Sequence, residues 1–131
     1  MQRLLLLASA VNGFLAVALG AFGAHGLKTR LADLPDVARR LGWWDTAAHY
    51  HLAHALALGM LALAADRISV VWAGRAGVAM VIGIALFSGS LYIMTLTGMT
   101  ALGAVTPLGG VGLLVGWLAL GIGALRSPVR Q

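Results

Sequence analysis

The chain has 131 residues, of which 60% are hydrophobic and 10% are charged, with no cysteine and a formal net charge of +5. A soluble domain has about 25% charged residues, so this composition predicts a membrane protein, formed as one domain over residues 1–131. The missing cysteine excludes disulfides, thiolate metal sites and cysteine nucleophiles. The basic residues are scattered between apolar runs, which favours contact with lipid headgroups and argues against a nucleic-acid partner.

Four apolar segments are long enough to cross a bilayer, because a span needs about 20 residues at roughly 1.5 Å each. They are residues 4–24, 46–65, 76–97 and 108–125. Backbone groups in lipid must be satisfied within the spanning segment, and the alternating strands of a barrel are absent, so each segment is predicted to be a helix. The predicted fold class is therefore all-α, a bundle of four transmembrane helices. The first segment imitates a secretory signal but is interpreted as a retained helix, since three spans follow.

The connection over residues 27–45 is predicted to be an amphipathic segment lying in the membrane interface. Its leucines recur at helical spacing, with charged residues on the other faces. We expect Pro35 to start a helix that leads into the second span and can bend at Gly42. Trp43 and Trp44 are predicted to anchor this segment at headgroup depth.

Four spans place both termini on one side of the membrane, and the distribution of charge predicts that this side is the cytoplasm. Acidic residues gather in the long connection, at Asp33, Asp36 and Asp45. The rule that basic residues lie inside is satisfied by a margin of one. The side of the termini carries Arg3, Arg67, Arg75, Arg126 and Arg130, and the other side carries Lys28, Arg30, Arg39 and Arg40.

Small residues recur at four-residue spacing in the predicted spans, which lets helix backbones approach closely in lipid. These pairs predict a compact bundle. The alternative is that one such face, above all on the fourth helix, forms an oligomer. The candidate packing residues are Ala73 with Gly77, Ala85 with Gly89, and Gly112 with Gly116.

Three polar residues are predicted to meet near the middle of the membrane. At 1.5 Å per residue, Asn12, His54 and Ser88 lie roughly 14, 16 and 18 Å from the side of the termini. Polar side chains inside a bilayer usually bond to one another or line a watery path. The pattern favours a hydrogen-bond clasp between helices, with a relay or ligand pocket as the alternative. Tyr92 continues the polar lining upward.

Three of the four histidines lie in the stretch "HYHLAH". His25, His49 and His51 are predicted to lie near the upper interface, and His54 to be buried and hydrogen-bonded. His51 and His54 share a helix face, as two metal ligands would, but His25 lies roughly 15 Å from His54 in depth, which argues against an axial haem pair.

No catalytic or cofactor motif stands out elsewhere in the chain. Ser88 and Ser90 in "FSGSL" lack the strained elbow and the acid of a hydrolase. The glycines of "GAFGAHG" lack the strand and helix context of a dinucleotide site, and Gly26 is available for a left-handed helix cap. We therefore predict no cofactor, no metal and no enzymatic activity.

Four segments in order, "LGAFGAHGLK", "YHLAHALAL", "LFSGSLY" and "GAVTPLGG", resemble the small bacterial inner-membrane family known as domain of unknown function 423 (DUF423). The chain is similar also to the eukaryotic transmembrane protein 256. The resemblance covers nearly the whole chain and implies a multi-pass protein of the bacterial inner membrane, without a known activity. It implies a polar constellation as a candidate ligand site, formed by Asn12, His25, Lys28, Tyr50, His54, Ser88 and Tyr92.

The leading functional hypothesis is a non-enzymatic accessory, assembly or stabilising component of a membrane complex. Its expected partners are membrane lipids and either further copies of itself or a larger membrane protein complex. The alternative is a binder of a small ligand, lipid or quinone, or a proton or solute transporter. That alternative would use a histidine-lined cavity in the half of the membrane away from the termini.

Overall fold

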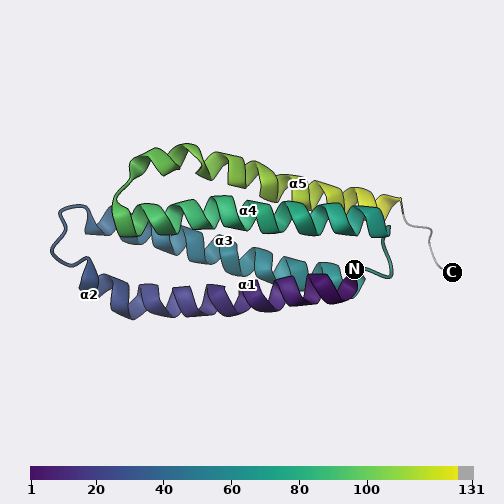
Figure 1. The fold of residues 1–131 in the computed structure, drawn as a ribbon, viewed down its shortest axis with the longest axis horizontal. Helices are drawn as coiled ribbons and strands as arrows, with labels where there is room; N and C mark the ends of the chain where they lie inside the picture. The colour runs from purple at the N-terminus through teal and green to yellow at the C-terminus, as the bar shows by residue number, and fades with distance from the viewer. Residues whose placement is uncertain (127–131) are drawn as a thin grey trace.

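The computed structural model describes residues 1–126, which form four long helices lying side by side along one axis (Figure 1). They are α1 (Gln2–Phe22), α3 (Val37–Ala64), α4 (Val70–Thr97) and α5 (Thr106–Leu125). Each is long and apolar enough to cross a membrane, and no strand occurs in the described chain. The predicted all-α fold with four spans is thereby confirmed. Arg130, counted above among the basic residues, lies outside the described residues.

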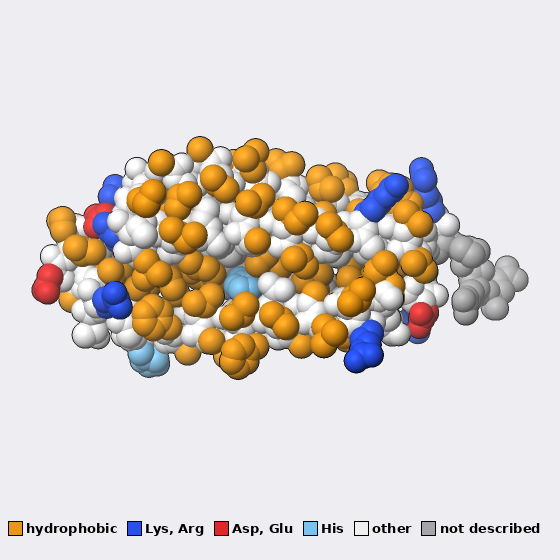
Figure 2. Space-filling view, in the orientation of Figure 1, with side chains coloured by type: hydrophobic (Ala, Val, Ile, Leu, Met, Phe, Trp, Pro, Cys, Tyr) orange, Lys and Arg blue, Asp and Glu red, His pale blue; other side chains and the backbone are white. Residues whose placement is uncertain are grey.

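The helices pack in chain order, α1 on α3, α3 on α4 and α4 on α5. The outer helices keep wide faces toward the surroundings. In an 18-residue apolar stretch of each span, 11% of the residues are buried in the span that contains α1 and 28% in the span that contains α5, against 44% in α3 and in α4. Apolar side chains cover the middle of the visible face, and Lys and Arg side chains gather toward its two ends (Figure 2). This distribution suits a bilayer with polar layers above and below.

The inner face of α1 follows a repeat of four and three residues, through Leu5, Ser9, Asn12 and Ala16. Leu5 and Ala16 are buried, and the Ser9 hydroxyl donates to the carbonyl of Ala55 on α3 at 2.8 Å. A repeat of this kind keeps one seam of a helix against its neighbour over several turns. Small and polar residues in that seam therefore determine how α1 and α3 meet.

The first span was predicted to end at residue 24, but the helix continues to Arg30. It does so through a π-helical turn at Gly23–Leu27 and the short α2 (Lys28–Arg30). The prediction of a left-handed cap at Gly26 is wrong, because Gly98 is the one glycine with positive φ among residues 1–126. The π-helical turn lies against Trp44. A Cβ at Gly23 would overlap this indole, whose Nε1 donates to the carbonyl of Leu19 at 2.9 Å.

Trp44 is 2% exposed, so its predicted role as an interface anchor is wrong. It packs against the Tyr92 ring at 4.5 Å between centroids, in a cluster with buried leucines of the connection. The prediction that Pro35 starts a helix leading into the second span is confirmed, because α3 begins at Val37 and runs through Gly42 without interruption. The first turns of α3 thus belong to the folded core. The apolar side chains of the connection, which were expected to lie in the membrane interface, pack into this core.

The start of α3 is joined to the end of α4 by Arg40. Its guanidinium donates to the carboxylate of Asp36 at 2.9 Å and to the backbone carbonyl of Thr95 at 3.1 Å. Carbonyls in the last turn of a helix lack helical partners and attract cations. A Cβ at Gly98 would overlap the guanidinium, so the left-handed glycine that ends α4 also makes room for this arginine.

Glycines bring the backbones of α4 and α5 into contact. A Cβ on Gly112 would lie 3.1 Å from Cα of Gly83, and a Cβ on Gly116 would lie 2.6 Å from Cγ of Met80. The Gly112 and Gly116 face is therefore occupied inside the chain, which agrees with the predicted close packing of the bundle and argues against the alternative that this face forms an oligomer. Ala85 is exposed, and no other element lies within 4 Å of a Cβ placed at Gly89, so this pair makes no such contact within the chain.

Candidate intramembrane polar site

Two histidines of α3 are buried between the helices, His51 at 4% and His54 at 7% exposure. The expectation that His51 lies at the interface is wrong, because Asn12 of α1 and Tyr92 of α4 enclose it. His25 and His49 are exposed. The buried polar site therefore combines the predicted His54 with an unpredicted partner one turn away.

His51 joins three helices through its two ring nitrogens. Nε2 lies 3.2 Å from Oδ1 of Asn12, and Nδ1 lies 3.4 Å from the hydroxyl of Tyr92. Asn12 donates its Nδ2 to the carbonyl of Ala8 at 2.8 Å, which leaves Oδ1 as the acceptor. This network assigns the proton to Nε2 of His51, and Nδ1 then accepts from Tyr92.

His54 joins α3 to α5 and carries the opposite tautomer. The indole Nε1 of Trp117 donates to Nε2 of His54 at 3.1 Å, and an indole nitrogen is a donor only. Nε2 is therefore unprotonated, and Nδ1 donates to the carbonyl of Tyr50 at 2.8 Å. The Tyr50 ring also stacks over His54, with centroids 6.0 Å apart. The bond from Trp117 requires an unprotonated Nε2, whereas the bond to Tyr50 does not depend on that nitrogen.

The predicted clasp of Asn12, His54 and Ser88 is wrong, because each residue has another partner. Asn12 bonds to His51, His54 bonds to Trp117, and the Ser88 hydroxyl donates to the carbonyl of Ala47 at 2.9 Å. Asn12 bonds to α3 about one turn before His54, and Ser88 bonds to it about two turns before His54, so the three side chains lie at different levels along α3.

Of the remaining members of the predicted constellation, Tyr92 joins the buried network through its hydroxyl, but His25, Lys28 and Tyr50 do not hydrogen-bond to it through their side chains. His25 and Lys28 are exposed beyond α1, and Tyr50 is 43% exposed and contributes its ring and its carbonyl. Ser9, His51 and Trp117 make interhelical bonds that the analysis of the sequence did not predict. The same spacing of four and three residues on α3 could have identified His51. It places His51 on the face of α3 that packs against the face of α1 carrying Asn12.

The two histidines differ in what they can do chemically. A second proton on His51 would convert Nδ1 to a donor, and the Tyr92 hydroxyl can accept it, so both bonds would persist. A second proton on His54 would abolish the bond from Trp117, because Nε2 would no longer accept. Within residues 1–126, no three His, Cys, Asp or Glu side chains converge as a metal site would need. The hydrogen bonds of His51 are thus compatible with one or two ring protons, whereas the bond from Trp117 to His54 is compatible with an unprotonated Nε2 alone.

Residues 19–110 match the family described as "Protein of unknown function (DUF423)". The UPF0382 membrane protein YwdK of Bacillus subtilis (strain 168) is 42% identical over 126 residues, which cover 95% of this chain and 98% of YwdK. The UPF0382 inner membrane protein YgdD of Escherichia coli (strain K12) is 40% identical over 125 residues, which cover 95% of this chain and 92% of YgdD. No solved structure matches the chain. The chain therefore belongs to the DUF423 family of multi-pass membrane proteins.

Proposed function

We propose that this protein is a non-enzymatic accessory component of a membrane protein complex, and that α1 is the helix it presents to its partner. The observation that carries this proposal is the contrast between how firmly α1 is bonded and how little of it is covered. Only 11% of the residues in an 18-residue apolar stretch of its span are buried. Yet polar bonds hold it at three heights, from Ser9 to Ala55, from Asn12 to His51 and from Trp44 to Leu19.

The outer face of α1 is a continuous apolar stripe. Its side chains are 52 to 74% exposed and recur at intervals of three and four residues, which places them on one side of a helix. Because the polar bonds on the opposite side set the rotation of α1, the stripe has a fixed direction. A fixed stripe suits packing against a partner helix. It consists of Leu4, Leu7, Val11 and Phe14.

The proposal places the protein in the inner membrane with both termini in the cytoplasm. YgdD, similar over 95% of this chain, is named an inner membrane protein. The N-terminus and the end of α5 lie at the same end of the bundle (Figure 1). Asp33, Asp36 and Asp45 lie at or near the start of α3, and the excess of basic residues over acidic ones is larger at the end of the termini.

The test is gentle extraction of the tagged protein from its own membranes, followed by native mass spectrometry. We expect a complex of defined stoichiometry with an identified partner, lost in an L7A/F14A variant of the stripe. The control is M60A/L63A on α3, which removes side chains that are also exposed, by 64 and 73%. A free wild-type protomer would contradict the proposal. A homo-oligomer lost in the same variant would assign the stripe to a second copy of the chain.

A second candidate function is a proton or small-ligand pathway that passes through His51. The bonds from His51 to Asn12 and Tyr92 support it, since both can persist when the imidazole gains a proton. Buried ionisable residues in membrane spans often serve proton relays. Proton flux in liposomes should then fall in a H51Q variant and be retained in H49Q, a control on the same helix with an exposed histidine. Equal flux in H51Q and wild type would exclude this path.

A further inference from the structure

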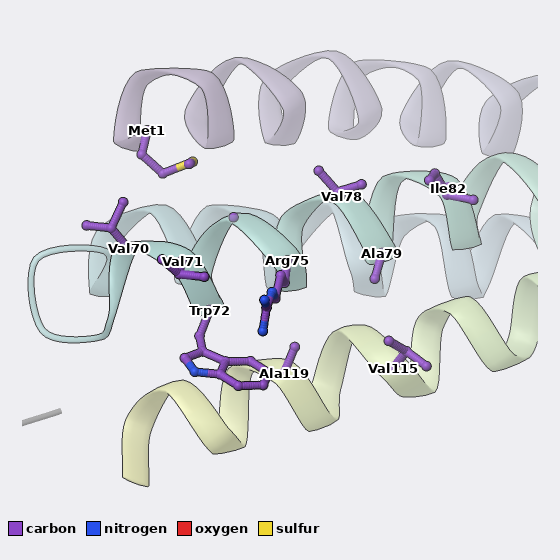
Figure 3. A pocket seen from close by; sticks show the side chains of 11 residues that line it. Met1, Val70, Val71, Trp72, Arg75, Val78, Ala79, Ile82, Val115 and Ala119 are labelled. Carbon is purple, nitrogen blue, oxygen red and sulfur yellow. The ribbon is translucent and has the colours of Figure 1, made fainter. Parts of the chain in front are cut away.

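A groove of about 730 Å³ lies at the end of the bundle where α1 begins. Figure 3 shows Met1 of α1 on one side, α4 along the middle and Val115 and Ala119 of α5 on the other side. Its volume falls within the range of roughly 300–1,000 Å³ that is common for small-molecule sites. The walls along α4 are aliphatic, provided by Val71, Val78 and Ile82. The groove is therefore suited to a hydrocarbon chain.

Positive charge is concentrated at one end of this groove. The guanidinium of Arg75, which lines the groove, lies 4.8 Å from the centre of the Trp72 ring, and that of Arg126 lies 5.3 Å from it. Neither arginine forms an ion pair with an acidic side chain in the described part of the chain. In Figure 3 the Arg75 side chain extends from α4 toward α5, beside the Trp72 indole. Two cations thus share one aromatic side chain, and no acidic side chain among residues 1–126 pairs with either of them.

This juxtaposition matches the chemistry of an anionic phospholipid. Tryptophan and arginine near the ends of membrane spans lie at headgroup depth, and basic pockets between spans bind anionic headgroups. Guanidinium groups also bind phosphate oxygens with two parallel hydrogen bonds. We propose that this groove binds one anionic phospholipid, with its phosphate on Arg75 and Arg126 and an acyl chain along Val78 and Ile82.

The test is native mass spectrometry of the full chain in a mild detergent, with phosphatidylglycerol or phosphatidylcholine of identical acyl chains added. We expect one phosphatidylglycerol to be retained in preference to phosphatidylcholine. The substitutions R75Q and R126Q should each weaken this preference roughly fivefold. The matched control is R67Q. Arg67 is exposed in the turn between α3 and α4, at the same end of the bundle but outside the groove.

A second pair of variants tests the apolar part of the groove without changing charge. V78W should fill the groove and reduce retention of both lipids, whereas V81W, on an exposed position of α4 outside the groove, should not. Equal retention of the two lipids by the wild type would overturn the proposal. So would equal losses in R67Q and R75Q, or retention of inorganic phosphate in place of the lipid. None of these results depends on the partner of α1.

Discussion

Oδ1 of Asn12 on α1 lies 3.2 Å from Nε2 of His51 on α3, and the same imidazole contacts the hydroxyl of Tyr92 on α4 at 3.4 Å. One side chain thereby connects three of the spanning helices. Lipid offers little hydrophobic drive for helices to associate, so packing and polar contacts of this kind specify which faces meet. The contribution of His51 can be separated from that of other histidines on the same helix.

Substitution of His51 by leucine should destabilise the bundle by roughly 1 to 3 kcal/mol, because it removes two interhelical bonds and leaves Asn12 and Tyr92 without their partner. The measurement is reversible unfolding in mixed micelles, followed by tryptophan fluorescence. His49→Leu is the matched control, since His49 is exposed two residues away on the same helix. Equal losses in H49L and H51L would show that the bonds of His51 do not contribute.

The two buried histidines should show opposite tautomers. Nitrogen-15 NMR of histidine-labelled protein is expected to find the proton on Nε2 of His51 and on Nδ1 of His54, because Asn12 and Trp117 impose these states. Trp117→Phe removes the donor to His54, so it should shift the His54 signals and leave those of His51 in place. Identical tautomers at both positions would contradict the assignment.

The contact between α4 and α5 should be highly sensitive to a single methyl group at Gly109. A Cβ there would overlap the backbone of Phe87, which cannot move without displacing α4. We expect Gly109→Ala to destabilise the fold by about 1 to 3 kcal/mol. Gly121→Ala on the same helix meets nothing within 4 Å and should stabilise the helix slightly. Thermal denaturation of the two variants in one detergent measures the difference, and similar midpoints would argue against close backbone contact.

Stability should depend on pH through Asp36. Hydrogen bonds from Arg39 and then Arg40 hold the pKa of this carboxyl below its ordinary value of 3.8. A carboxyl whose pKa is lower in the folded state adds stability above its unfolded pKa and loses it as the pH falls through the folded pKa. Asp36→Asn should therefore lower the unfolding midpoint at neutral pH, and its difference from wild type should shrink as the pH falls through the lowered pKa of Asp36.

The control for this pH dependence is Asp33→Asn, because Asp33 is exposed in the same connection. It should leave the midpoint unchanged throughout the titration. A difference between D36N and wild type that stays constant down to acidic pH would mean that the charge of Asp36 is not the source of the effect.

Local chemistry along the chain determined the class of this protein. Four apolar runs of sufficient length predicted four spanning helices, because the cost of burying polar groups in lipid depends on each segment's own composition. The helix ends were less predictable. The first helix continues past its predicted end at a place where Gly23 leaves room for the indole of Trp44, a residue from another element.

The partners of the polar and small residues were decided by tertiary structure. Depth along a helix axis follows approximately from residue number, so Asn12 was predicted to lie at the level of His54, one turn from the His51 that it contacts. Its bond to His51 and not to His54 depends on the register and rotation of α1 against α3, which packing along their whole length decides. For the same reason Gly112 and Gly116 serve the contact between α4 and α5 within one chain, although their spacing alone was equally compatible with an oligomer.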